Sequence, residues 1–381
     1  MTSPRDPAEL VNRVEKLALR HTALREEVQR VQTAEALTRT RLTQAWAQAL
    51  IGEAQARAEA GAAAMRAYRA VARERPARRN RIKRRLDIAL GRLGAVGAAL
   101  IIARSGLWTG DALSTVLAYT RRRPDPAIQP AALFDQAWYL AAYPDVASGS
   151  MAPLAHYIAH GGREGRTPHP LLDVNFYTMR NRADLDRTGL SPLEHFVHIG
   201  AARGCDPHPL FRIDHYVAQA PDLAESGENP LTHYLRDGWR RDLNPHPLFD
   251  GVQYRANTSP GEAETPALIH YLTLGSRQGR KPHRLFDPVW YRQQYPDVAD
   301  GGFEALTHYV TAGGGEGRYP GPWFDAPRYI GLRGDQLRRD VDPLTDYLQG
   351  GAWTVAEPIL TEAADLRLTP LEHWAARADA S

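Results

Sequence analysis

The sequence has only one cysteine, Cys205, in 381 residues. One cysteine cannot form an internal disulfide bond or a cysteine-based zinc site. A low cysteine content is typical of proteins in a reducing compartment. Long apolar runs are lacking as well: the uncharged stretch from Leu93 to Ala103 has eleven residues, whereas a helix needs about 20 to cross a membrane. The N-terminus has neither the basic start nor the apolar core of a secretory signal, so we expect a cytoplasmic protein.

An excess of charge of one sign is also missing. The net charge is +3 and the isoelectric point is near 8.9, too mild a bias to indicate nucleic acid, and no helix-turn-helix, RRM or zinc-finger spacing is present. The sequence has no G-x-S-x-G nucleophile motif, and the glycines 313–315 lack the Lys-Ser/Thr of a phosphate-binding loop. We therefore expect no enzymatic activity and no cofactor.

What the sequence does contain is a unit of about 38 residues that recurs six times from Leu133 onward. An apolar residue marks each unit, at intervals of 38, 39, 38, 37 and 38 residues: Phe134, Leu172, Phe211, Phe249, Phe286 and Phe324. A marker histidine followed by Tyr or Phe recurs in phase, at His156, His195, His233, His270 and His308. Such a period predicts an all-α fold in which residues 131–381 form an α-solenoid of about six short helix pairs.

The first unit shows how each helix is expected to begin and end. Asp135 has the position of an N-cap, and Pro144 ends the first helix. Proline suits the first position of the second helix, where a missing N–H costs nothing; it recurs at Pro153, Pro192, Pro230, Pro266, Pro343 and Pro370. A glycine five residues after each marker histidine predicts a left-handed residue beyond the helix end, at Gly161, Gly200, Gly238, Gly275 and Gly313.

We interpret the repeated side chains as the structural motif of each unit, because repeat-equivalent residues meet equivalent neighbours. The set is Phe134, Asp135, Trp138, Tyr139, His156, Tyr157, His195, His233, Tyr234, His270, Tyr271, Asp287, Trp290, Tyr291, His308 and Tyr309. Ligands of one metal ion must converge, whereas repeated histidines lie a unit apart, so no metal site is expected. Each imidazole should instead satisfy loop carbonyls or a neighbouring aspartate. A second histidine set, in Pro-His-Pro or Pro-His-Arg, comprises His169, His208, His246 and His283.

The repeated acidic residues predict caps and turns rather than a unique pair of catalytic carboxylates. The predicted caps are Asp135, Asp173, Asp250, Asp287 and Asp325, and the predicted turn residues are Asp145, Asp222 and Asp297. Two Glu-Gly-Arg triplets, Glu164 to Arg166 and Glu316 to Arg318, allow two interpretations. They form ion pairs within the loop, or they expose a row of arginines to an anionic glycan.

Residues 8–75 predict one long helix. Apolar residues follow alternating spacings of four and three, the heptad seam of a coiled coil, at Leu10, Val14, Leu17, Leu24, Val28 and Val31. His21 occupies the remaining seam position and weakens it, and Leu42 follows after a stutter. Valine at one seam position and leucine at the other favour a parallel homodimer. The alternative is a single helix folded back on the repeats.

Residues 76–130 predict a basic and apolar connector. The basic run includes Arg78, Arg79, Arg81, Lys83, Arg84 and Arg85, and the apolar stretch from Leu93 follows it. One interpretation is an interfacial anchor, which would place the protein peripherally at the inner face of the cell membrane, where anionic lipids attract basic residues. The other is a solvated charged face followed by a buried helix that caps the array.

The repeat, FDxxWYxxxYPDV followed by PLxHYxxxGxxEGR, resembles one found beside glycosyltransferase domains in bacterial proteins of cell-surface polysaccharide synthesis. Residues 134–146, 153–166, 286–298 and 313–318 carry the resemblance, and the lead-in ARSGLW at 103–108 is similar as well. The chain departs from the pattern at Arg212, at 251–254, at Asp346 in place of a histidine, and around 371–374. The resemblance implies a physiological setting, not a reaction, because the catalytic domain of those proteins has no counterpart here.

These observations predict a non-catalytic scaffold or adaptor in cell-surface polysaccharide synthesis. Its expected partners are proteins, such as glycosyltransferases or export components, and a second copy of the chain. Two alternatives remain open. A carbohydrate-binding array requires exposed aromatic residues at non-repeated positions, such as Trp108, Trp239 and Trp353. A glycosyltransferase remnant requires alternating strands and helices.

Overall fold

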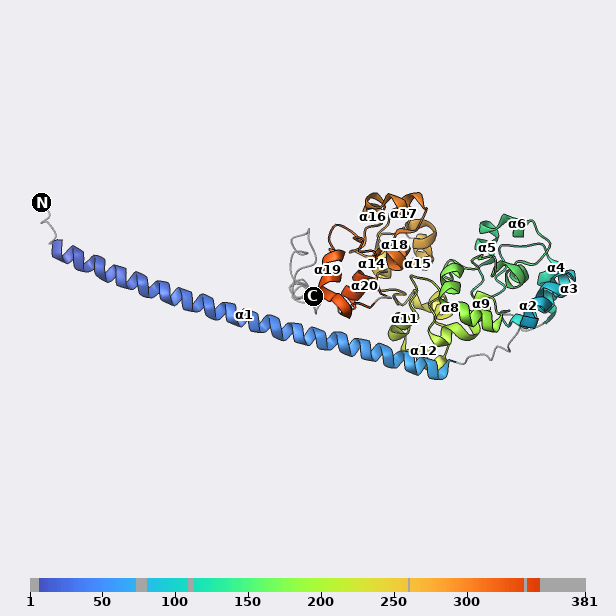
Figure 1. The fold of residues 1–381 in the computed structure, drawn as a ribbon, viewed down its shortest axis with the longest axis horizontal. Helices are drawn as coiled ribbons and strands as arrows, with labels where there is room; N and C mark the ends of the chain where they lie inside the picture. The colour runs from blue at the N-terminus through green and yellow to red at the C-terminus, as the bar shows by residue number, and fades with distance from the viewer. Residues whose placement is uncertain (1–6, 73–80, 109–112, 260, 339–340, 350–381) are drawn as a thin grey trace.

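The computed structural model describes residues 7–72, 81–108, 113–259, 261–338 and 341–349 (Figure 1). Within these ranges the chain forms helices and loops, with three isolated β-bridges and no β-strand. The all-α class predicted from the sequence is confirmed. None of the described helices is both long and apolar enough to cross a membrane.

Helix α1 (Pro7–Val71) is one continuous helix of 65 residues, about 98 Å long at 1.5 Å per residue. Most of it projects away from the rest of the molecule (Figure 1). Its last turns pack on α11 (Ile213–Gln219) and α12 (Pro221–Ser226), where Met65, Tyr68 and Ala72 are buried. The described contacts therefore anchor the helix at its C-terminal end.

Small residues permit this close docking of α1. A Cβ atom at Gly61 would lie 3.3 Å from the Cβ of Ala218, and one at Gly204 would lie 2.9 Å from the terminal carbon of Met65. Arg69 adds a hydrogen bond to the carbonyl oxygen of Arg203, at 3.0 Å. The contact therefore joins α1 to the middle of the repeat array.

In the described part of the chain, three helices lie between α1 and the first unit: α2 (Arg81–Gly91), α3 (Gly94–Ser105) and α4 (Leu113–Arg121). The inner face of α3 is buried against α4 and α7 (Pro153–His156). The Tyr119 hydroxyl on α4 accepts a hydrogen bond from the backbone N–H of Leu154, at 3.2 Å. The apolar stretch of the connector thus packs on the first unit, as its second interpretation proposed, although Leu93, Val96 and Leu100 face outward.

The helical units follow in chain order (Figure 1). Their first helices are α5 (Gln136–Ala142), α8 (Val174–Thr188), α11, α14 (Gly251–Ala256), α16 (Pro288–Gln294) and α19 (Ala326–Arg333). Their second helices are α7, α9 (Pro192–His195), α13 (Pro230–His233), α15 (Ala267–His270), α18 (Ala305–His308) and α20 (Pro343–Leu348). Short helices α6 (Pro144–Ala147), α10 (Ala201–Arg203), α12 and α17 (Pro296–Asp300) complete the units.

The predicted caps are confirmed. The carboxylates of Asp135, Asp173, Asp250, Asp287 and Asp325 accept backbone N–H groups in the first turns of the helices that follow them. Pro153, Pro192, Pro230 and Pro343 begin second helices as predicted. Pro266 does not, because α15 begins one residue later at Ala267. Pro370 lies outside the described residues.

Backbone hydrogen bonds join each unit to the next. The residue immediately before the first helix of one unit donates its N–H to the carbonyl of a proline that lies four residues before the marker of the next unit. The five bonds, at 2.9–3.0 Å, are Asp135 to Pro168, Asp173 to Pro207, Arg212 to Pro245, Asp250 to Pro282 and Asp287 to Pro320. These bonds repeat with the period of the sequence, so the array is stabilised by contacts between neighbours.

An aromatic cluster forms the core of each unit. In the first unit the ring centroids of Phe134, Tyr139 and Tyr157 lie 5.0–6.0 Å apart, and all three side chains are fully buried. Phe211, Tyr216 and Tyr234 repeat the arrangement in the third unit at 5.3–5.8 Å. Tyr271, Tyr291 and Tyr309 are equally buried, so these predicted motif residues do form the core.

Candidate functional site: a polar network in each unit

The most strongly repeated polar contact joins a tyrosine on the first helix to the marker histidine on the second. The tyrosine hydroxyl lies 2.7–3.2 Å from the histidine Nδ1 in five units; the pairs are Tyr139–His156, Tyr177–His195, Tyr216–His233, Tyr254–His270 and Tyr291–His308. The marker histidines were predicted to bond loop carbonyls or a neighbouring aspartate, but their recurrent hydrogen-bond partner is a tyrosine hydroxyl. The tyrosine partner was not predicted, although it lies five residues after every unit marker.

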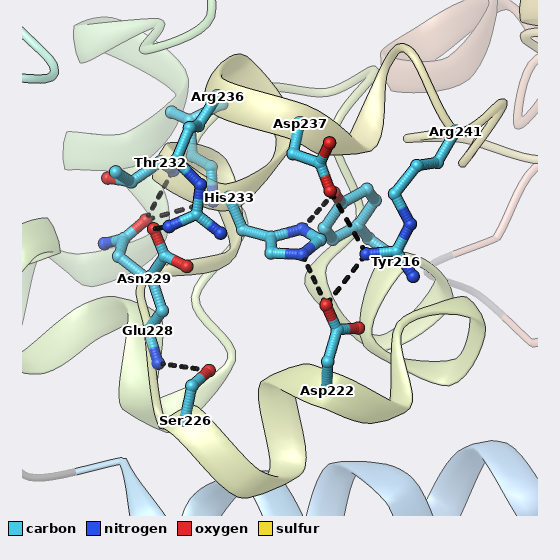
Figure 2. A network of polar contacts seen from close by, with 11 residues as sticks. Tyr216, Asp222, Ser226, Glu228, Asn229, Thr232, His233, Arg236, Asp237 and Arg241 are labelled. Atoms are coloured by element: carbon cyan, nitrogen blue, oxygen red, sulfur yellow. Dashed lines mark hydrogen bonds and ion pairs between the residues drawn. The ribbon is translucent and has the colours of Figure 1, made fainter.

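The third unit shows the complete network (Figure 2). Nε2 of His233 lies 3.0 Å from Oδ2 of Asp222, and the same oxygen accepts from Arg241 at 2.8 Å. Because a carboxylate only accepts, Nε2 carries a proton, and in the tautomer protonated at Nε2 alone Nδ1 accepts from the Tyr216 hydroxyl. Both ring nitrogens are therefore occupied. The predicted turn residue Asp222 is in fact in the first turn of α12, where its carboxylate bridges the histidine and the arginine.

Equivalent acids occupy this position in other units with looser geometry. Asp184 lies 3.8 Å from Nε2 of His195, and Glu262 lies 3.5 Å from Nε2 of His270. Each acid also pairs with an arginine, Arg203 at 2.6 Å and Arg280 at 3.1 Å respectively. Neither acid was singled out from the sequence: Asp184 does not follow a proline as Asp222 does, and Glu262 lies closer to its histidine along the chain than Asp222 does.

The electrostatics of the network favour charged acids and neutral imidazoles. The hydrogen bond from Arg241, with that from His233, lowers the pKa of Asp222 to about 2. Burial lowers the pKa of His195 to about 4, and Asp184 only partly opposes this effect. Burial likewise lowers the pKa of His156 and His308, assisted by Arg166 and Arg318.

The five glycines that follow the histidines are not left-handed, and this prediction was wrong. Gly200, for example, has φ of −63° and ψ of −42°. The left-handed residue comes four positions later in each of these units, at Gly165, Gly204, Asp242, Gly279 and Gly317. The glycines are required for a different reason: a Cβ atom would lie only 1.8–2.3 Å from the tyrosine hydroxyl at Gly161, Gly200, Gly238, Gly275 and Gly313.

A π-helical turn places each of these glycines against its tyrosine. The turns are Tyr157–Gly161, Phe196–Gly200, Tyr234–Gly238, Tyr271–Gly275 and Tyr309–Gly313. Hydrogen bonds five residues apart, such as Gly162 N–H to Tyr157 carbonyl at 2.9 Å, define the wider turn. A π-helical turn often marks a functional site, but its recurrence in five units indicates a structural role here.

The sixth unit replaces the histidine by Asp346. The Tyr329 hydroxyl donates to Oδ2 of Asp346 at 2.6 Å, and Arg333 forms an ion pair with the same oxygen at 2.8 Å. Both charged side chains are largely buried, at 13% and 11% exposure. The change from imidazole to carboxylate is therefore accompanied by a compensating cation.

The second histidine set supports the loops between units. Nδ1 of His169, His208, His246 and His283 accepts the backbone N–H two residues later, at 3.0–3.2 Å. Burial lowers the pKa of His169 and of His208 to about 4. It also lowers the pKa of His246 well below its ordinary value, assisted by Arg212. The imidazoles of His169, His208 and His246 are therefore neutral near pH 7.

The two Glu-Gly-Arg triplets form ion pairs within the loop, as the first interpretation held. Arg166 contacts Glu164 and Asp145, each at 2.7 Å. Arg318 contacts Glu316 at 2.6 Å and Asp297 at 2.8 Å. Because each guanidinium already has two acidic partners and is about one-fifth exposed, it is poorly placed to bind a glycan anion.

The remaining predicted residues are distributed over three regions. Trp138 and Trp290 are half-buried on first helices. Leu17, Leu24, Val28 and Val31 of the seam are 51–62% exposed on α1, and no side chain of Leu10 or Val14 is described. Arg78 and Arg79 lie outside the described residues, as do the side chains of Arg81, Lys83, Arg84 and Arg85.

No three His, Cys, Asp or Glu side chains among the described residues are grouped so that they could hold a metal ion. No protein-family model matches the sequence, and neither a curated protein nor a solved structure is significantly similar to it. The geometry of the chain itself therefore carries the functional argument.

Proposed function

We propose that this protein is a non-catalytic repeat scaffold of the α-solenoid type that acts in cell-surface polysaccharide synthesis and self-associates through α1. The observation that carries the proposal is the projection of α1 from the array with its seam exposed. A solvent-exposed helix of this length gains little from its array contact, so its apolar stripe requires another helix. The polysaccharide setting rests on the resemblance of the repeat.

The polar networks support a structural rather than a chemical role for the array. In the third unit both histidine nitrogens and the acid have partners within the unit. The same arrangement recurs with the repeat, whereas catalytic groups form one unique constellation. The array therefore offers surface for partners.

The two alternatives receive less support. Trp239, one of the aromatic residues required by a carbohydrate-binding array, is 6% exposed, and Trp108 packs on Tyr119 with ring centroids 5.2 Å apart. Trp353 lies outside the described residues. A glycosyltransferase remnant requires strands that the described part of the chain does not form.

Contact with the cytoplasmic face of a membrane is part of the same proposal. Four apolar residues directly after the basic run in the sequence are 37–61% exposed: Leu86 on α2, Leu93 at the N-cap of α3, and Val96 and Leu100 on α3. Exposed apolar residues beside basic residues suit a surface of anionic lipid.

We expect the protein to co-sediment with vesicles that contain phosphatidylserine, but not with vesicles of phosphatidylcholine alone. The double substitution Leu93→Asp with Val96→Asp should abolish this binding. Equal binding to both vesicles would contradict the electrostatic part.

Affinity purification after mild crosslinking in the native host tests the scaffold. The bait is the full chain, and the control is a chain that begins at residue 56, because this truncation keeps the docked end of α1. Recovery of glycosyltransferases or export components supports the scaffold. Recovery of glycan without a protein partner supports the carbohydrate-binding alternative, and sugar transfer by the purified protein would refute the non-catalytic assignment.

A further inference from the structure

The described side chains of α1 between residues 16 and 33 are exposed, so the array leaves this face of the helix uncovered. Its seam combines Leu17, Leu24, Val28 and Val31 with His21. A second copy of the chain can cover the seam in two orientations. The charges beside the seam distinguish them, because flanking residues of a coiled coil meet different partners in parallel and antiparallel pairs.

A parallel pair brings like charges together. In heptad terms Leu17 and Leu24 are d positions and His21 and Val28 are a positions, so Arg20 occupies g and Arg25 occupies e. A g residue of one helix faces the e residue of the next heptad in a parallel partner, so Arg20 meets Arg25 on both sides of the dimer. His21 would also face its own copy in the same layer.

An antiparallel pair in one register removes both conflicts. When Leu17 of one chain faces Val28 of the other, His21 faces Leu24. Every seam layer then contains an apolar residue. Flanking g residues now meet one another, and Arg20 faces Glu27 of the second chain at both ends of the overlap. Charge complementarity therefore favours this register.

We propose that two copies associate through residues 14–31 of α1 as an antiparallel pair in which Leu17 faces Val28. This inference rests on the self-association proposed above and revises the parallel orientation expected from the valine and leucine positions alone. The symmetry centre lies between residues 22 and 23. The anchored ends of the two helices, from Gly61 onward, are therefore separated by about 115 Å, at 1.5 Å per residue. The paired α1 helices therefore hold the two repeat arrays at opposite ends of the dimer.

Disulfide trapping tests the orientation in the full chain with Cys205→Ser, which removes the native thiol. The Leu17→Cys protein, the Val28→Cys protein and an equal mixture of the two are each oxidised. We expect crosslinking only in the mixture, because residue 17 faces residue 28 across the pair. In single-variant samples identical positions lie 11 residues apart along the axis, about 16 Å, beyond the reach of a disulfide. Leu19→Cys, on the outer face and 71% exposed, is the control that should crosslink in neither sample.

The outcomes separate this inference from the proposed function. Crosslinking of Leu17→Cys with itself would overturn the antiparallel orientation and leave self-association standing. A monomeric mass at all concentrations, measured by analytical ultracentrifugation, would overturn both.

Charge reversal gives a second test, because it should change the dissociation constant in opposite directions for the two orientations. Arg20→Glu should weaken association about tenfold in an antiparallel pair, because it faces Glu27, and adding Glu27→Arg should restore it. In a parallel pair the same change would strengthen association, because the introduced carboxylate would face Arg25. Arg30→Glu changes the charge equally on the outer face and should leave the dissociation constant unchanged.

Discussion

The hydroxyl of the first-helix tyrosine occupies the space that a Cβ atom would need at the glycine five residues after the marker histidine. One small residue therefore fixes two features of the unit, the approach of the two helices and the Tyr–His hydrogen bond. In the third unit the residues concerned are Gly238, Tyr216 and His233. The glycine is selected for lack of a side chain, not for backbone freedom.

Gly238→Ala should therefore destabilise the protein by about 2–4 kcal/mol, because the new methyl group would lie 1.8 Å from the Tyr216 oxygen and displace the ring. Gly331→Ala is the matched control. Gly331 lies inside α19 with nothing within 4 Å of its Cβ position, so alanine should leave stability unchanged or raise it by up to about 1 kcal/mol. Denaturant unfolding monitored by circular dichroism measures both.

Adding Tyr216→Phe to Gly238→Ala should recover part of the loss, since the clash is with the hydroxyl oxygen. A double-mutant cycle with purely additive free energies would refute this explanation of the glycine.

The sixth unit provides a second residue-scale prediction. Asp346→Ala leaves Arg333 largely buried without its carboxylate and Tyr329 without an acceptor, so we expect a loss of about 2–4 kcal/mol. Replacing Arg333 by Ala as well should cost less than the sum of the two single changes. Asp335→Ala, on an exposed neighbouring turn, should change the free energy of unfolding by less than about 0.5 kcal/mol.

At the scale of elements, the sequence predicted the helices well because their signals are local. Asp135, Asp173 and Asp250 cap helices as expected, since a cap depends only on the following turn. The glycine prediction failed because the Gly238 environment is set by Tyr216, 22 residues earlier in the chain. The acids Asp184 and Glu262 were missed because Asp184 lacks the preceding proline that marks Asp222, and Glu262 lies at a different distance before its histidine.

The docking of α1 could not be predicted from its sequence either. The last turns are rich in alanine, and nothing in them specifies the third unit as their partner. Met65 packs where Gly204 has no side chain, and Gly61 of α1 lies against Ala218 of α11; this complementarity exists only in three dimensions.

Truncation of α1 should therefore have two distinct effects. A chain that begins at residue 56 removes the projecting part and keeps Met65, Tyr68 and Ala72, so its melting temperature should equal that of the full chain. A chain that begins at residue 73 removes those buried side chains and should melt several degrees lower, because it exposes the face of α11 and α12. Equal melting temperatures for all three chains would show that the docked end contributes no stability.

At the scale of the whole molecule, buried ionisable groups make stability depend on pH in two opposing ways. The pKa values of His169, His208 and His195 are lowered to about 4, so their folded forms are neutral. Unfolding lets each imidazole bind a proton below its ordinary pKa near 6.5. Stability from these groups is therefore present above pH 6.5 and is lost as the pH falls towards 4.

Two buried acids act in the opposite direction. Burial raises the pKa of Asp206 and of Asp342 to about 6. Their folded forms hold a proton that the unfolded chain releases above about pH 4, so they destabilise the fold as the pH rises from 4 to 6. Each group changes the free energy of unfolding by at most about 1.4 kcal/mol per pH unit. Since the shifted histidines outnumber the acids, the protein should lose stability between pH 6.5 and 4.

Two substitutions separate the contribution of the histidines from that of the acids, and each keeps the hydrogen bond that the original side chain makes. His208→Asn keeps an acceptor for the Leu210 N–H but cannot titrate, so it should flatten the loss of stability between pH 6.5 and 4. Asp342→Asn keeps a good N-cap for α20 and removes the opposing acid, so the dependence on pH should become steeper. Urea midpoints at half-unit pH steps measure both slopes. If His208→Asn and the unmodified protein gave parallel curves, His208 would already be protonated or exposed in the fold, and the account of these loops as neutral buried imidazoles would be wrong.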